Sequence, residues 1–164
     1  MPLVISEADY SDPVHARGIV DVLDSYASDP MGGGRPLRTE VRERLVPELR
    51  AHPTALVLLA LGDPGPVGVA VCFLGFSTFE ARPLLNVHDL AVLPQHRGRG
   101  VGRALLAGVE QRARARGCCK LTLEVLDTNE TARHLYARFG FQDFAVQGSP
   151  VPTRFLSKKL ERTR

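Results

Sequence analysis

The chain is poor in cysteine, with three among 164 residues. Three is an odd number, and Cys72, Cys118 and Cys119 match neither a paired extracellular disulfide framework nor the CxxC spacing of a metal site. We therefore expect a protein of the reducing cytoplasm that holds no metal.

Long apolar runs and a large excess of charge of one sign are also missing. No apolar run approaches the roughly 20 residues of a membrane span. The first residues reach acidic side chains without the basic leader and apolar core of a secretory signal. A formal charge of +3 allows an anionic ligand but is too small to argue for nucleic acid. We expect neither a membrane nor a nucleic acid as partner.

Length and composition are those of an ordinary globular domain. Apolar residues make up 44% of the chain and charged residues 24%, close to the averages for soluble folded proteins. No internal repeat or long linker divides the chain, so we predict a single domain over residues 1–164.

Periodicity and turn residues predict a mixed α/β order. Apolar residues at helical spacing predict helices over 12–26, 39–50, 101–116 and 129–139. Compact or alternating apolar runs predict strands over 3–6, 54–61, 67–79, 84–93, 120–126, 142–146 and 153–160. Antiparallel hairpins come first and a strand–helix–strand crossover follows. This order predicts one central, mixed and mostly antiparallel sheet flanked by helices.

The most informative segment joins a predicted strand to the start of a helix. It reads Arg97-Gly98-Arg99-Gly100-Val101-Gly102-Arg103. A helix N-terminus presents unpaired N–H groups and partial positive charge, and glycines let that backbone approach a phosphate closely. We therefore predict a pyrophosphate-binding turn. A Walker loop would need Lys and then Ser or Thr after the last glycine, but Arg103 and Ala104 follow here, which argues against nucleotide hydrolysis. A dinucleotide fingerprint would need a parallel unit before the turn, whereas the strands predicted here are antiparallel.

Two motifs in this half of the chain carry a family resemblance. The pattern Arg97-x-x-Gly100-x-Gly102 resembles the Arg/Gln-x-x-Gly-x-Gly/Ala signature of the GNAT superfamily, the acyl-coenzyme A dependent N-acetyltransferases. Leu123-Glu124-Val125, followed by Asn129 and Tyr136, resembles the later motif of the same family. The resemblance implies a sheet splayed at the cofactor site, acetyl-CoA as cosubstrate, and direct acetyl transfer to a primary amine of a small molecule or peptide.

The resemblance also implies roles for particular residues. The backbone of Leu90, Ala91 and Val92 would pair with the pantetheine arm, and residues 97–103 would hold the pyrophosphate. Asn129 would bind the pantetheine, and Tyr136 would protonate the leaving sulfur.

The resemblance does not name a single general base. Histone-type members have a Glu where this chain has Asn86, and an Asn side chain does not accept a proton at neutral pH. Glu124 precedes Tyr136 by twelve positions, as in ribosomal-protein alanine acetyltransferases, where that Glu is the proposed base. His88 is the second candidate and Asp89 the third. An alternative function is a catalytically idle acyl-CoA sensor or interaction module, although retention of both Glu124 and Tyr136 argues against it.

The sequence gives the least information about the binding site of the amine acceptor. The resemblance places the acceptor between the loops at residues 29–35 and 147–154. A closed pocket there would favour a small molecule, and an open groove would favour a peptide. The sequence is compatible with a homodimer.

Overall fold

The computed structural model describes residues 2–160 and shows the predicted α/β order. The helices are α1 (Pro13–Ser28), α2 (Thr39–Ala51), α3 (Val101–Ala115) and α4 (Glu130–Phe139), with a short 3₁₀ turn, η1, at Pro94–His96. The strands are β1 (Val4–Glu7), β2 (Ala55–Leu61), β3 (Pro66–Ser77), β4 (Arg82–Val92), β5 (Leu121–Leu123), β6 (Ala145–Val146) and β7 (Ser149–Pro150). Within the described residues, no helix is long and apolar enough to cross a membrane.

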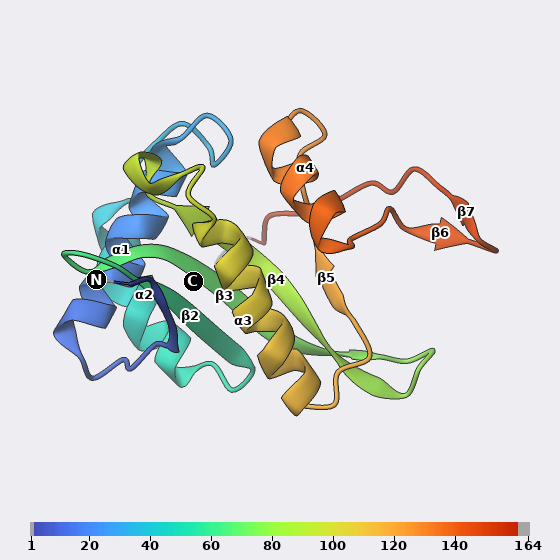
Figure 1. The fold of residues 1–164 in the computed structure, drawn as a ribbon, viewed down its shortest axis with the longest axis horizontal. Helices are drawn as coiled ribbons and strands as arrows, with labels where there is room; N and C mark the ends of the chain where they lie inside the picture. The colour runs from blue at the N-terminus through green and yellow to red at the C-terminus, as the bar shows by residue number, and fades with distance from the viewer. Residues whose placement is uncertain (1, 161–164) are drawn as a thin grey trace.

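Five strands form the central sheet in the order β1-β2-β3-β4-β5. The first three pairings are antiparallel and only β4 pairs in parallel with β5. Helices α1 and α2 cover one face and α3 covers the other (Figure 1). The mixed, mostly antiparallel sheet predicted from the sequence is therefore confirmed.

Strand β2 shows why the sheet sits at the centre of the molecule. Its side chains alternate between the two faces, so that Leu58 packs in the core under α3 and Leu59 in the core under α1 and α2. Both side chains are fully buried. A strand covered on both faces reads as a continuous apolar run, which is the pattern of residues 55–61.

Strand β4 contains a bulge in its middle. In the register with β3, Val71 lies opposite Asp89 whereas Cys72 lies opposite Val87, so His88 is an extra residue on β4. The bulge breaks the alternation of faces. His88 contacts Phe73, which packs in the core under α1 and α2, and Asp89 faces the same two helices.

The predicted strand over 120–126 is too long. Strand β5 ends at Leu123 and pairs only with residues 85–87 of β4, because the two strands diverge beyond the bulge (Figure 1). Glu124 therefore follows the strand as an exposed residue instead of alternating along it.

The prediction that strands over 142–146 and 153–160 complete the sheet is also wrong. β6 and β7 form a separate two-stranded hairpin, and residues 153–160 form no strand. The hairpin closes tightly through Gln147 and Gly148, which adopt φ angles of 52° and 78°. Pro150 and Pro152 then lack the N–H donors that a further ladder would require. Residues 152–160 are exposed throughout.

Removal of a side chain from the central strand should lower stability strongly. Leu58 is 0% exposed, so we expect Leu58→Ala to lower the free energy of unfolding by about 2–5 kcal/mol, through lost burial and the cavity left behind. Leu160→Ala is the control, because Leu160 is 85% exposed. Urea unfolding followed by circular dichroism measures both, and equal midpoints for the two variants would contradict this account of the core.

Candidate functional site

The glycine-rich turn has the geometry of an anion site. Gly98 and Gly100 have φ angles of 72° and 81°, in the left-handed region, and a Cβ on either glycine would meet no atom within 4 Å. No side chain caps α3, and its first backbone bond runs from the Ala104 N–H to the Gly100 carbonyl at 2.9 Å. The N–H groups of residues 101–103 thus have no partner within the helix and point out of its positive end.

The last glycine of the motif has a different task. A Cβ on Gly102 would lie 3.1 Å from Cδ2 of Leu135, so the absence of a side chain lets α4 pack closely on the first turn of α3. This packing brings the segment that carries Tyr136 next to the turn.

The three arginines of the turn differ in their surroundings. Arg97 donates from Nε to the Val92 carbonyl at 3.0 Å and from Nη1 to the Asp29 carboxylate at 2.9 Å. Its guanidinium therefore joins the end of β4 to the loop between α1 and α2. Arg99 and Arg103 are exposed and form no ion pair within residues 2–160, which leaves both charges available to an anion.

Asp29 organises the loop that Arg97 contacts. Its carboxylate accepts the Met31 N–H at 2.9 Å, and its carbonyl accepts the N–H groups of residues 32–34 at 2.8–3.1 Å. The Met31 bond and the Arg97 guanidinium hold the pKa of Asp29 below its usual value. The loop that the sequence places beside the acceptor is thus tied to the candidate cofactor turn.

The open edge of β4 lies on the other side of the turn. The Leu93 N–H bonds the Val67 carbonyl on β3 at 2.9 Å. Backbone groups alternate in direction along a strand, so those of Leu90 and Val92 point away from β3 toward the gap beside β5. Ala91 points its backbone to β3, opposite Val69, and buries its side chain. An extended ligand can pair with such an edge as another strand would.

Tyr136 is a largely buried phenol on α4. Its ring meets the ring of Phe141 edge-on, with the centroids 5.8 Å apart. Burial raises the pKa of Tyr136 to about 12, and Tyr26 on α1 acts in the same direction. The phenol therefore keeps its proton at neutral pH and can act as a donor. Tyr26 was not predicted as a site residue, because it occupies an apolar position in the helical pattern of α1.

The structure separates Asn129 and Glu124 from the buried part of the site. Asn129 caps α4, with its side-chain oxygen accepting the Ala132 N–H at 3.1 Å. Its amide nitrogen remains for a ligand. Glu124 is exposed beyond the end of β5, and within the described residues it makes no ion pair.

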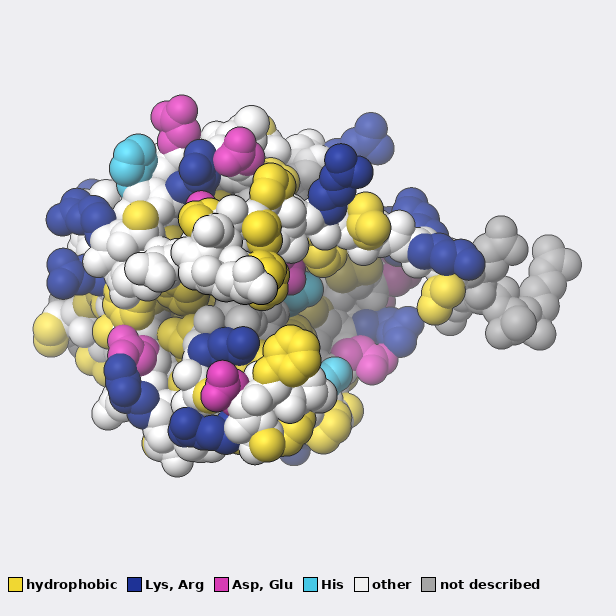
Figure 2. Space-filling model, turned by 90° about the vertical axis from the view of Figure 1, so that its right-hand side faces the viewer, with side chains coloured by type: hydrophobic (Ala, Val, Ile, Leu, Met, Phe, Trp, Pro, Cys, Tyr) yellow, Lys and Arg dark blue, Asp and Glu magenta, His cyan; other side chains and the backbone are white. Residues whose placement is uncertain are grey.

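The β4 bulge brings His88 and Asp89 to one face with different surroundings. His88 is exposed, and its ring lies 5.4 Å from that of Phe73. Asp89 lines a chamber of about 220 Å³ between α1, α2 and the bulge. Burial raises the pKa of Asp89, whereas the neighbouring His88 lowers it, and Asp89 in turn raises the pKa of Tyr26. Figure 2 shows the hollowed face of the molecule, with acidic and histidine side chains at depth.

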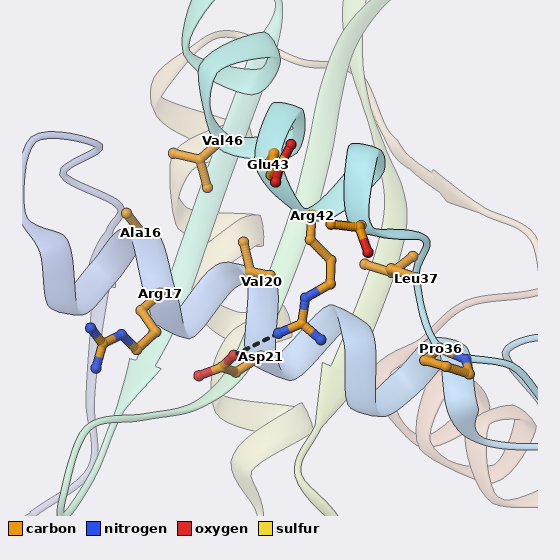
Figure 3. Close-up of a pocket in the computed structure, with 10 residues that line it drawn as sticks. Ala16, Arg17, Val20, Asp21, Pro36, Leu37, Arg42, Glu43 and Val46 are labelled. Carbon is orange, nitrogen blue, oxygen red and sulfur yellow. Dashed lines mark ion pairs between the residues drawn. The ribbon is translucent and has the colours of Figure 1, made fainter.

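A larger hollow of about 830 Å³ lies between the outer surfaces of α1 and α2 (Figure 3). Its lining contains none of the residues predicted from the sequence. Arg42, which lines it, is paired with Asp24 at 2.8 Å and with Asp21 at 3.8 Å. The charged side chains of the lining are Arg17 and Arg42 against Asp21 and Glu43, so the charges of this hollow sum to zero. Among residues 2–160, no group of three or more His, Cys, Asp or Glu side chains is arranged to hold a metal ion.

Comparison with known proteins agrees with the fold. The model of the acetyltransferase (GNAT) family matches residues 20–141, and the chain belongs to this family. It is 38% identical to the thialysine N-epsilon-acetyltransferase of Bos taurus over 92 residues, which are 54% of each chain. It is 46% identical to the streptothricin acetyltransferase of Streptomyces lavendulae over 83 residues, 51% of this chain and 42% of that one.

The matches to these relatives do not cover the whole length of either chain. The chain spans about half the length of the curated relatives it matches. The solved ribosomal-protein-alanine N-acetyltransferase of Brucella melitensis biovar Abortus 2308 superposes with a TM-score of 0.68 at 24% identity. That superposition covers 93% of this chain and 99% of the other, and it is a likeness of fold.

The burial of Asp89 leads to a prediction about stability and pH. Because burial raises the pKa of Asp89, its ionised form is disfavoured in the folded chain, and stability is lost as pH rises from the ordinary pKa of Asp to the raised one. We expect Asp89→Asn to melt at a higher temperature than the wild type at pH 8. The gain should shrink as pH falls to about 4, the ordinary pKa of Asp, where the wild-type carboxyl is protonated.

Thermal unfolding followed by circular dichroism at several pH values provides the measurement. Asp127→Asn is the matched control, since the Asp127 side chain is 96% exposed and should give little pH-dependent difference. A melting temperature of Asp89→Asn at or below that of the wild type at pH 8 would argue against a buried, destabilising carboxylate.

Proposed function

We propose that this chain transfers an acetyl group from acetyl-CoA directly to a primary amine. The observation that carries the proposal is the uncapped N-terminus of α3 at the end of the open β4 edge, with the partly buried Tyr136 phenol on the adjoining helix. Membership of the GNAT family supports the same reaction. The names of the relatives support an amine as the acceptor.

Different residues bind the diphosphate and the pantetheine arm of acetyl-CoA. The N–H groups at the start of α3, with Arg99 and Arg103, bind the diphosphate. Leu90 pairs through its backbone N–H and carbonyl with the pantetheine arm, and Val92 through its N–H, because its carbonyl accepts from Arg97. Arg97 contributes by holding the turn and the β4 end together, because its guanidinium is engaged by Val92 and Asp29. Asn129 keeps an amide nitrogen for the same arm while its oxygen caps α4.

The transfer step needs two protons to be moved. The amine nitrogen forms a bond to the acetyl carbonyl carbon, the carbon–sulfur bond breaks, and its electron pair leaves with sulfur. Tyr136 donates a proton to that thiolate, whose ordinary pKa lies near 8.5, and recovers one from the nitrogen. The other proton of the ammonium passes to a base and then to solvent. A backbone N–H at the open β4 edge stabilises the oxyanion.

Position distinguishes the three candidate bases. Asp89 supports the role best, because its carboxylate lines the chamber and its raised pKa makes it a stronger base than an ordinary Asp. His88, next to it on the bulge, is placed to relay a proton to solvent. Glu124 is the weakest candidate because it is exposed beyond β5. Separate Asp89→Asn, His88→Asn and Glu124→Gln variants rank the three through kcat.

Substitution of Gly100 tests the cofactor turn. Gly100→Val forces a β-branched residue into a left-handed conformation and puts a side chain where the diphosphate approaches, so we expect at least a tenfold rise in the Kd of acetyl-CoA. Gly117→Val is the matched control. Gly117 follows the opposite end of α3, has a φ angle of 69°, and also has open space at its Cβ. Calorimetric titration should give the control an unchanged Kd, and equal weakening in both variants would refute the turn assignment.

Substitution of Tyr136 tests the chemistry. We expect Tyr136→Phe to lower kcat about 10²- to 10³-fold with little change in the Kd of acetyl-CoA, because the hydroxyl acts only as the thiolate leaves. The pKa of about 12 also means that loss of the Tyr136 proton should not lower wild-type kcat below about pH 11. Release of free CoA thiol in the presence of an active amine measures both. Unchanged kcat would remove the proton-donor role, and binding of acetyl-CoA without amine-dependent release would favour the sensor alternative.

A further inference from the structure

The chamber beside Asp89 has a chemical character that selects among amines. Apolar side chains form most of its wall, with Leu23 from α1, Leu37 from the segment before α2, and Val41 and Leu45 from α2. The polar contributions come from the Tyr26 phenol and the Asp89 carboxylate. Of the described residues that line the chamber, Asp89 is the one that carries a charge.

The neighbouring carboxylate of Asp29 does not change the net charge of the chamber. Asp29 is paired with Arg97 at 2.9 Å and does not line the chamber. His88, the closest basic side chain along β4, is exposed on the bulge and also lies outside the lining. The chamber therefore offers one unpaired negative charge against a hydrocarbon wall. A ligand with one cationic nitrogen and an apolar body satisfies both, whereas a second ammonium group would be buried without a partner.

The size of the chamber limits that body. A volume of about 220 Å³ is the liquid volume of about seven water molecules at ~30 Å³ each. It is smaller than a typical drug-sized site and has room for a body of about that number of non-hydrogen atoms. A peptide segment or a branched polycation would leave most of its body outside the chamber.

We propose that the acceptor is a primary monoamine with a short alkyl or arylalkyl body, whose nitrogen pairs with Asp89 while the hydrocarbon fills the chamber. This assignment rests on the proposed acetyl transfer and names its substrate class. Asp89 lies one residue from Leu90, whose backbone faces the gap beside β5, so an amine held there is next to the place proposed for the thioester. The burial that raises the pKa of Asp89 also favours transfer of a proton from the bound ammonium.

Two amines of equal size test the proposal. n-Hexylamine and 1,5-diaminopentane each have seven non-hydrogen atoms and differ only in a methyl group or an ammonium group at the far end. We expect kcat/KM for n-hexylamine to exceed that for the diamine at least tenfold, measured as acetyl-CoA-dependent release of CoA thiol. Benzylamine, with eight non-hydrogen atoms, should resemble n-hexylamine, and a peptide with a free N-terminus should be a poor acceptor.

A single substitution should reverse this preference. Val41→Asp adds a second carboxylate to the chamber wall at the third residue of α2, where the helix dipole favours negative charge, so the fold should tolerate it. We expect the variant to use 1,5-diaminopentane better than n-hexylamine. Val41→Asn is the matched control, because it has the same shape without the charge, and it should keep the wild-type order of the two amines.

Separate outcomes identify which assignment fails. A wild-type enzyme that prefers the diamine or the peptide would overturn the monoamine proposal and leave acetyl transfer intact. The monoamine proposal also fails if Val41→Asp and Val41→Asn give the same order of amines. Calorimetric titration with acetyl-CoA alone tests the proposed function by itself, and a chain that binds no acetyl-CoA would overturn both.

Discussion

Strand β4 is hydrogen-bonded to β3 along nearly its whole length but to β5 only over residues 85–87, and the candidate site depends on this unequal pairing. The antiparallel partner holds the strand in place on both sides of its bulge, while the short parallel contact lets β5 diverge. The backbone groups of Leu90 and the N–H of Val92 are thus left without a strand partner beside a rigid sheet, while the Val92 carbonyl accepts from Arg97. An edge that would be a liability elsewhere becomes a place for an extended ligand.

The two halves of the site meet at a few long-range contacts around this edge. Arg97 connects the glycine-rich turn to Asp29, 68 positions earlier in the chain. Gly102 lets Leu135 approach α3, and this contact brings Tyr136 toward Tyr26. The side chains proposed to bind the cofactor, donate the proton and hold the acceptor therefore come from α1, α2, β4, α3 and α4. The well-packed sheet between the helices keeps them in place.

Asp89 illustrates the balance between stability and function in this fold. A carboxylate partly buried against Leu23 and Leu45 lowers the stability of the folded chain at neutral pH, because its charge has little hydration and no cationic partner in the chamber. The same lack of a partner makes it a ligand for an ammonium group. The charge that is unfavourable for folding thus distinguishes this chamber from the larger hollow. In that hollow Arg42 is paired with Asp21 and Asp24.

The sequence by itself determined the helices, the antiparallel hairpins at the start of the sheet, the glycine-rich turn before α3 and the family, because each of these depends on local periodicity or on residues close together in the chain. Its periodicity overestimated the length of β5 and placed residues 142–146 and 153–160 in the central sheet, since an alternating pattern does not specify a partner strand. Only the tertiary structure decided that His88 bulges out of β4, that Asp89 turns toward α1 and α2, and that Arg97 is bound by Asp29. The physical reason is that one extra residue in a strand changes which face a side chain takes, and strand register is set by contacts between distant segments.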